Sequence, residues 1–154
     1  MPPAELSQLQ NALLTWFVEH QRDLPWRKNY LAYGVWISEM MLQQTRVATV
    51  LDYYDRWMKA LPSIPSVAAA DEATILKLWE GLGYYARARN IHRAAKQICE
   101  QHSGEFPNDY DAIRQLPGIG PYTAGAISSI AFEQDRPVVD GNVIRVLCRL
   151  LNLD

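Results

Sequence analysis

Apolar residues recur at helical spacing along nearly the whole of this chain. Near the N-terminus, Leu6, Leu9, Leu13, Trp16 and Phe17 are spaced as one face of an amphipathic helix requires. No segment shows a convincing alternation of apolar and polar residues, which a half-buried strand would need. The sequence therefore predicts an all-α fold without internal repeats or low-complexity segments.

The helix boundaries follow from residues that begin or end helices. Pro2 and Pro3 suit the first turn of the N-terminal helix, and Pro25 in the stretch RDLPWRKN breaks this helix. Asp71 can cap a helix whose end is marked by Gly81. Further helices are expected at about 32–43, 47–60, 71–83, 86–102, 109–115, 122–132 and 142–151, with the segment LPSIPS (61–66) as a connecting loop.

Composition limits the classes of protein to consider. A chain of 154 residues, 49% hydrophobic and 21% charged, can form one ordinary domain that buries roughly 70% of its unfolded surface. No apolar stretch reaches the ~18–20 residues of a membrane span, and no secretory signal precedes the first helix. We therefore expect a protein without membrane partners that is not secreted, cytoplasmic in a bacterium or nuclear or mitochondrial in a eukaryote.

The two cysteines do not indicate a metal site, and the net charge does not indicate a strongly basic protein. Cys99 and Cys148 lie far apart without metal-ligand spacing and are expected to be free core thiols. The net charge of −2 is not typical of a strongly basic nucleic-acid binder. One run, RARNIHRAAK (87–96), carries four basic residues and no acid, which by itself is typical of a solvated helix face.

Residues 116–127 (LPGIGPYTAGAI) form the first motif with chemical meaning. Gly118 and Gly120 allow a tight turn and a close approach that side chains would prevent. The N–H groups at the start of the next helix then remain available for a phosphate. Such a hairpin binds nucleic-acid backbone without reading sequence, although an ordinary helix–helix turn would use the same residues.

Two acidic residues stand in unusual positions. Glu39 lies inside the apolar run of ISEMMLQQT (37–45), where it would be either a hydrogen-bonded core residue or a functional group. Asp140 follows the apolar segment 137–139 and precedes Gly141, a position that suits a helix N-cap. Neither acid by itself indicates a reaction.

Four segments together resemble the adenine DNA glycosylases of the MutY family, within the helix-hairpin-helix glycosylase superfamily. They read WISEMMLQQTRVATV, LWEGLGYYARARN, LPGIGPYTAGAISSIAF and VVDGNVIRVL, and the similarity runs from about Leu24 to the end of the chain. The resemblance implies an enzyme of base excision repair. Such an enzyme hydrolyses the N-glycosidic bond of adenine mispaired with 8-oxoguanine or guanine.

The resemblance also implies a helix-hairpin-helix glycosylase fold. A six-helix barrel would span about 24–133, with the hairpin at 112–127. Residues 1–22 and 134–154 would be parts of a second, incomplete helical lobe, namely the N-terminal helix and the start of the cluster domain. Residues 1–154 would then act as a single helical catalytic region.

In this family the two acids have different roles. The residue matching Glu39 protonates adenine at N7 and then helps to activate water, so its pKa must be raised toward neutrality, as burial among apolar residues would do. The residue matching Asp140 remains ionised and stabilises the cationic sugar. Asn142 and Tyr122 resemble residues that orient these groups and line the pocket, although Tyr122 could also be a core tyrosine. Related endonuclease III enzymes usually carry a nucleophilic lysine at the position of Tyr122, so the resemblance implies a monofunctional glycosylase.

The implied partner is double-stranded DNA from which the adenine is flipped out of the stack. Gln44, Leu82 and Tyr84 match residues that wedge into the stack or contact the opposite base, and the glycines of GLGYY (81–85) are expected to project the latter two outward. The remaining predicted site residues fall into two groups: Gly118, Gly120 and Thr123 would contact the DNA backbone, while Trp26, Arg27, Gln43 and Arg87 would line or support the pocket, with Arg87 beside the pocket or near the backbone.

The chain also differs from its relatives. Full-length members carry four cysteines that hold a [4Fe–4S] cluster and a later domain that recognises 8-oxoguanine, and both are missing from these 154 residues. Apolar faces at both ends of the chain are therefore expected to be partly uncovered, which predicts self-association. Two other functions stay open, namely a thymine glycosylase acting on G·T mismatches and a non-catalytic helix-hairpin-helix module that binds DNA.

Overall fold

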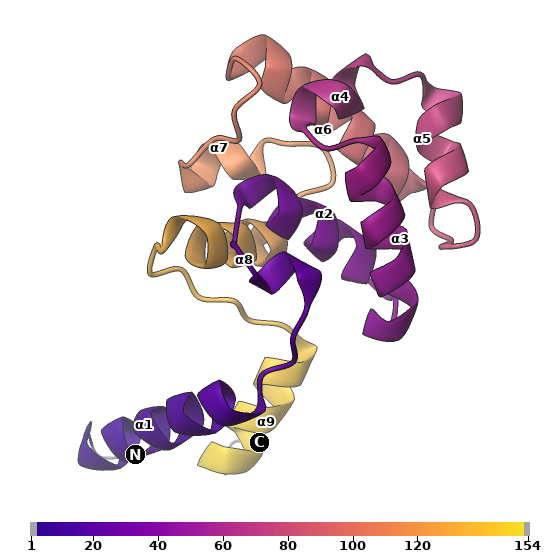
Figure 1. The fold of residues 1–154 in the computed structure, drawn as a ribbon. Coiled ribbons are helices and arrows are strands. Elements are labelled where there is room, and N and C mark those ends of the chain that lie inside the picture. The colour runs from indigo at the N-terminus through magenta and orange to yellow at the C-terminus, as the bar shows by residue number, and fades with distance from the viewer. Residues whose placement is uncertain (1–2, 153–154) are drawn as a thin grey trace. The chain divides into compact units, whose positions relative to one another are not determined.

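Helices follow one another along the chain in the computed structural model, which describes residues 3–152 (Figure 1). They are α1 (Pro3–His20), the 3-10 helix η1 (Pro25–Arg27), α2 (Ala32–Leu42), α3 (Val47–Ala60), α4 (Ile64–Ala69), α5 (Glu72–Trp79), α6 (Ala86–Gln101), α7 (Tyr110–Arg114), α8 (Pro121–Phe132) and α9 (Gly141–Leu151). Between residues 3 and 152 there is no strand, so the all-α prediction is confirmed. The expectation for Pro2 lies outside the described residues.

Helix α4 is absent from the sequence-based expectation, which treated 61–66 as a loop. Ser63 caps this helix by accepting a hydrogen bond from the Ser66 N–H, and the Ser66 hydroxyl accepts one from the Ser63 N–H in return. Pro65 fits the first turn, where its missing N–H costs nothing. Ile64 and Val67 are buried, and α4 packs against α6. Two prolines in six residues interrupt the helical periodicity of this segment, so the pattern of apolar residues did not indicate a helix.

The chain divides into two compact units. One consists of residues 25–138, with η1 and helices α2 to α8. The other combines the chain before Pro25 with the chain after Val138, and so contains α1 and α9. None of the described helices has both the length and the apolarity to cross a membrane.

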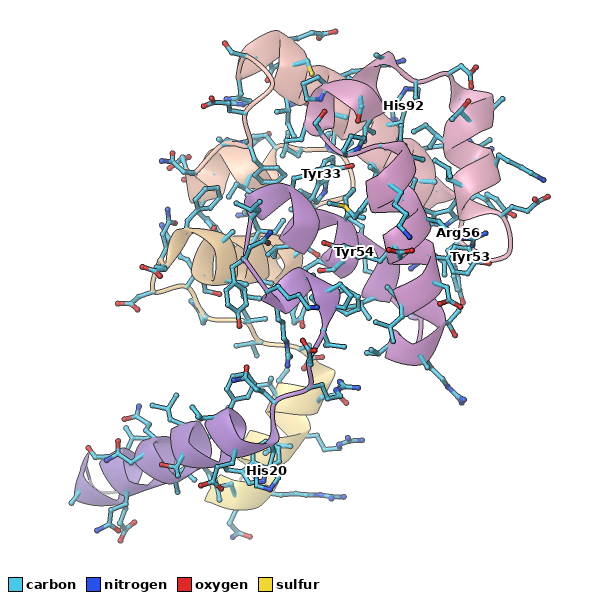
Figure 2. The ribbon with its side chains drawn as sticks, viewed as in Figure 1. His20, Tyr33, Tyr53, Tyr54, Arg56 and His92 are labelled. Atoms are coloured by element: carbon cyan, nitrogen blue, oxygen red, sulfur yellow. The ribbon has the colours of Figure 1, made fainter. Side chains whose placement is uncertain are left out.

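The core of the larger unit is built around three fully buried tryptophans. Trp57 and Trp79 meet edge to face with ring centroids 5.8 Å apart, which joins α3 to α5. Trp36 of α2 is the third, and its helix packs against α3, α6 and α8. Figure 2 shows Tyr33 within this unit, where its hydroxyl accepts a hydrogen bond from Trp57 Nε1 and donates one to the Leu61 carbonyl. Aromatic rings of this size each bury ~150–250 Å² and dominate the stability of such a core. The helix that carries Glu39 is therefore fixed on several sides.

Helix α8 carries a glycine where a side chain would collide with backbone. A Cβ added to Gly125 would lie 2.7 Å from the carbonyl oxygen of Pro137. We expect Gly125→Ala to destabilise the protein by about 1–3 kcal/mol, because the clash outweighs the ~1 kcal/mol helix-propensity advantage of alanine. Urea unfolding followed by circular dichroism measures this loss.

The matched control is Gly120→Ala, where an added Cβ meets no heavy atom within 4 Å. Gly120 has a φ of −90°, which alanine adopts without strain, and it occupies the N-cap of α8. The control is expected to unfold at nearly the wild-type urea concentration. Equal stability of the two variants would show that Pro137 does not lie against Gly125 in solution.

The unit that contains α1 and α9 leaves many apolar side chains on its surface. No described residue of α9 is fully buried, and the exposed side chains include Leu13, Leu14, Trp16, Val18, Ile144, Val146 and Leu150. Exposed apolar surface of this kind drives association. We expect the 154-residue chain to elute in size-exclusion chromatography with an apparent mass that rises with concentration. A constant monomeric mass by light scattering over a hundredfold concentration range would contradict this.

Candidate active site

Glu39 occupies the third turn of α2 between buried neighbours. Ser38 and Met40 on either side are fully buried, as is Ile37, while Glu39 itself is half-buried. A position inside a helix with these neighbours leaves the carboxyl partly removed from water. The local sequence therefore produces an acid in an apolar setting.

The pKa of Glu39 is raised above its ordinary value of 4.5. Burial is the main cause, because desolvation penalises the charged carboxylate, and the positive charge of Arg27 opposes the shift. Arg27 ends η1, which packs against α2. Trp26, the preceding residue, is buried and meets the ring of Tyr54 edge to face at 5.1 Å. Trp26 thus braces this turn, while Arg27 supplies charge next to Glu39.

Asp140 caps α9 in the other unit. Its Oδ1 accepts hydrogen bonds from the N–H groups of Asn142 at 2.9 Å and Val143 at 2.8 Å. The side-chain amide of Asn142 donates a further bond to Oδ2 at 3.1 Å. These bonds favour the ionised form and hold the pKa of Asp140 below its usual range, with the Val143 N–H as the largest cause. The N-cap position that the sequence suggested is confirmed, and Asn142 orients the carboxylate.

The glycine hairpin joins α7 to α8. Gly118 has a φ of +79°, and a Cβ there would lie 2.7 Å from the Asn90 side chain, so both its conformation and its surroundings require glycine. Gly120 forms the N-cap of α8 without a side-chain cap, and the helix begins with Pro121. Tyr122, in the first turn, is 42% exposed. Tyr122 is therefore not a core residue.

Two loops beside α2 and α6 each contain a non-glycine residue in the left-handed conformation. Gln44, just after α2, has a φ of 57°, and Tyr84, in the turn between α5 and α6, has a φ of 49°. A side chain costs ~1–2 kcal/mol in this conformation, so it persists only where the surroundings impose it. Both residues line one hollow of about 760 Å³, together with Gln43 and Arg87. The structure thus brings together four of the predicted site residues.

The expectation that Leu82 projects outward is wrong. Tyr84 is 64% exposed, whereas Leu82 is only 6% exposed. The Leu82 N–H donates to the Trp79 carbonyl, which continues the last turn of α5 and directs the leucine inward. The positive φ values of Gly81 and Gly83 reverse the chain on either side of Leu82. Of the two residues expected to project outward, Tyr84 alone has an exposed side chain.

The interpretation of Arg87 as part of a solvated helix face is wrong. Arg87 is 6% exposed, and burial lowers its pKa, although a guanidinium keeps its proton at neutral pH. Its side chain donates hydrogen bonds to the main-chain carbonyls of Gln43 and Gly83, one in each loop. Arg87 is thus a supporting residue.

Gln43 and Thr123 link α2 to α8. The Gln43 side-chain amide donates to the Thr123 hydroxyl at 3.4 Å and lies 3.5 Å from the Met40 sulfur. Thr123 is buried, so its backbone N–H in the first turn of α8 is the group left for the predicted DNA contact.

Sequence reasoning missed Tyr53 as a support of the GLGYY turn. The Tyr53 hydroxyl donates to the Glu80 carbonyl at 2.9 Å, and the Arg56 guanidinium lies 4.4 Å above its ring. Figure 2 shows Tyr53 and Arg56 together on α3 beside this turn. From the other side, Trp79 Nε1 donates to the Gly83 carbonyl at 2.9 Å. Helical spacing placed these aromatic residues on their helices but did not indicate a role in the loop.

The donor set of this chain does not fit an iron–sulfur cluster. A [4Fe–4S] cluster is held by four cysteine thiolates, and the chain has two cysteines, Cys99 on α6 and Cys148 on α9. Within residues 3–152, no group of three or more His, Cys, Asp or Glu side chains could hold a metal ion.

Comparisons with known proteins agree with this arrangement. The family model of HhH-GPD superfamily base excision DNA repair proteins matches residues 37–154. The chain is 49% identical to the adenine DNA glycosylase of Rattus norvegicus and 47% identical to that of Homo sapiens, in both cases over 96% of its own length. It spans 30% and 29% of the length of these two relatives.

Solved structures show the same fold. A thermostable thymine-DNA glycosylase superimposes with a TM-score of 0.86 at 27% identity, covering 92% of this chain and 65% of that one. Endonuclease III in a non-covalent complex with DNA superimposes with a TM-score of 0.83 at 24% identity, covering 97% and 69%. The fold and the family match extend over most of the chain, so the predicted helix-hairpin-helix glycosylase fold is confirmed. The chain belongs to the HhH-GPD superfamily of base excision DNA repair proteins.

Proposed function

We propose that this protein hydrolyses the N-glycosidic bond of adenine mispaired with 8-oxoguanine or guanine in duplex DNA. The observation that carries the proposal is Glu39, a half-buried carboxyl whose pKa is raised by desolvation. A module that only binds DNA has no use for such an acid, whereas removal of a base needs a proton donor near neutral pH. The sequence identity to adenine DNA glycosylases supports adenine as the base.

In the proposed reaction, protonated Glu39 transfers its proton to N7 of the flipped adenine. The bond between N9 and the sugar carbon C1′ then breaks, and its electron pair leaves with the base. The sugar becomes an oxocarbenium-like cation, which the ionised carboxylate of Asp140 stabilises. Water adds to C1′, and its proton passes to the Glu39 carboxylate, which restores the acid. The strand remains intact, since Tyr122 offers no amine for a Schiff base.

The direct test is base release from defined duplexes. The 154-residue chain is incubated with duplexes that contain A·8-oxoguanine, A·G or G·T, and heating in alkali then reveals abasic sites. We expect adenine release that is lost in Glu39→Gln and kept in Glu100→Gln, which alters an exposed acid of α6. Adenine release that Glu39→Gln leaves unchanged would contradict the proposal.

A thymine glycosylase acting on G·T mismatches is the second candidate. One solved structure of similar fold is a thymine-DNA glycosylase, at 27% identity. The G·T duplex distinguishes the two functions within the same assay. Thymine release without adenine release would replace the first proposal with the second.

Tyr122→Lys tests the monofunctional part of the proposal. Because Tyr122 is 42% exposed in the first turn of α8, a lysine there would keep its amine accessible. We expect this variant to nick the strand after base removal and to be trapped on DNA by borohydride, which reduces the Schiff base. The wild type serves as the control without an adduct. If the variant gives no trapped adduct, residue 122 does not face the abasic sugar.

A further inference from the structure

Arg87 is buried, and no acidic side chain among residues 3–152 pairs with it. Ion pairs of this part of the chain such as Lys59–Asp55, Lys77–Glu80 and Arg89–Glu72 do not include Arg87. Burying a guanidinium is costly unless its donors are satisfied. The groups that compensate the charge of Arg87 therefore indicate the role of this residue.

One terminal nitrogen of Arg87 caps the C-terminal end of α2. Nη1 donates to the carbonyls of Met40 at 3.1 Å and Met41 at 2.8 Å, and also to that of Gln43. The last carbonyls of a helix lack partners within the helix and carry partial negative charge, so a cation is favoured there. The guanidinium thus replaces an acidic partner with three oriented dipoles.

The other terminal nitrogen holds the turn between α5 and α6. Nη2 donates to the carbonyls of Leu82 at 3.3 Å and Gly83 at 3.2 Å, and to the Thr45 hydroxyl at 3.2 Å. The carbon at the centre of the guanidinium lies 5.5 Å from the centre of the Tyr84 ring. A single rigid group therefore joins two loops that lie about 40 residues apart in sequence.

The anchored carbonyls stand directly before the two strained residues. The Gln43 carbonyl precedes Gln44, and the Gly83 carbonyl precedes Tyr84, and both of these residues are held in the left-handed conformation. Fixing the preceding peptide restricts the backbone angles that decide where the next side chain points. Gln44 and Tyr84 consequently line the same hollow.

We propose that Arg87 is a positioning residue that holds the Gln44 and Tyr84 loops in a fixed position relative to each other. As a result, both side chains enter the duplex together when a base leaves the stack. This inference rests on the proposed function, because it assigns the two loops to the opening of a base pair. A lysine cannot replace Arg87, since its single nitrogen cannot reach the carbonyls of both loops at once.

Hydrogen exchange on the free chain tests the bracing without DNA. The Thr45 N–H bonds to the Leu42 carbonyl, and the Leu82 N–H bonds to the Trp79 carbonyl, so both amides report on their loops. In Arg87→Lys we expect these two amides to exchange about tenfold faster or more, while those of α4 change little. The matched control is Arg93→Lys, an exposed residue of the same helix. Equal exchange in the two variants would overturn the bracing.

Single-turnover base release tests the consequence. Adenine opposite 8-oxoguanine must be unpaired, whereas adenine opposite a tetrahydrofuran abasic analogue is already free. We expect Arg87→Lys to slow release about tenfold or more from the first duplex and to stay within about threefold of wild type on the second. Arg93→Lys should match wild type on both. Equal losses on both duplexes would show a general structural defect and overturn the proposal.

A second variant guards against poor folding of Arg87→Lys. Thr45→Val keeps the shape of the side chain and removes one acceptor of Nη2. We expect the rate of release to fall about threefold for the paired adenine and to stay unchanged for the unpaired adenine. If the rate for the paired adenine does not fall selectively, the result counts against the proposal.

A 2-aminopurine placed beside the adenine reports unstacking independently of bond cleavage. If the wild-type chain unstacks DNA and releases no adenine, the proposed function fails, while the difference in unstacking between Arg87→Lys and wild type still decides the role of Arg87.

Discussion

Glu39→Gln is expected to lower the single-turnover rate of adenine release by about 10²–10⁴-fold, the usual contribution of a general acid. Glutamine fits the same space and keeps hydrogen-bonding capacity, but it has no acidic proton to give to N7. The measurement is base release from an A·8-oxoguanine duplex at saturating protein. Binding of the same duplex, followed by fluorescence anisotropy, should change little, which would separate the chemical step from recognition.

The pH dependence of the reaction follows from the direction of the Glu39 shift. Its pKa is raised above 4.5, and the reaction uses the protonated form, so the rate should fall as pH rises through the raised pKa. Removing the charge of Arg27, which opposes the shift, should raise the pKa further and move this fall to higher pH. The pH–rate profile of Arg27→Gln compared with wild type measures the displacement. A fall that moved to lower pH would contradict the assignment of Glu39 as the acid.

The raised pKa of Glu39 also predicts that Glu39→Gln makes the folded protein more stable at neutral pH, although it lowers activity. Because the folded state holds the Glu39 proton more tightly than the unfolded chain, the stability that this group contributes is present below about pH 4.5 and lost as pH rises through the folded pKa. Glu39→Gln stays neutral throughout. It should therefore melt above the wild type at neutral pH and close to it near pH 4. A lower melting temperature at neutral pH would show that the carboxylate stabilises the fold.

Asp140→Asn is expected to slow adenine release by about 10²–10³-fold, because in the proposed reaction the developing cation loses the negative charge that stabilises it. Asparagine is as good an N-cap as aspartate, so it can still accept hydrogen bonds from the Asn142 and Val143 N–H groups. The variant should consequently melt close to wild type at neutral pH. Such a result would separate the catalytic role of Asp140 from its capping role.

Asp140→Ala provides the comparison, since it removes the charge and the cap together. A lost cap destabilises the helix it begins, so this variant should be as slow as Asp140→Asn and also less stable. The stability that ionised Asp140 contributes is present above its ordinary pKa of 3.8 and lost as pH falls through the lowered folded pKa. An active Asp140→Asn would limit Asp140 to its structural role.

Most helices could be predicted because their signals are local. Asp71 and Asp109 accept from N–H groups three residues later, as caps should, and helices α3 and α6 lie where apolar spacing placed them. Helix α4 was not predicted, because a capping box between two serines indicates a helix less strongly than two prolines indicate a loop. The burial of Leu82 was not predicted, because it depends on the direction of a turn that is set by the end of α5.

The chain by itself determined most of the helices, the glycine hairpin and two acids with different surroundings. Each of these depends on neighbours within a few residues, namely an apolar run around Glu39 and free N–H groups after Asp140. Only the tertiary structure decided that Arg87 lies inside the fold and that Leu82 turns inward while Tyr84 faces out. The physical reason is that a buried guanidinium needs oriented carbonyls from two loops, and only the packed helices bring those carbonyls to one place.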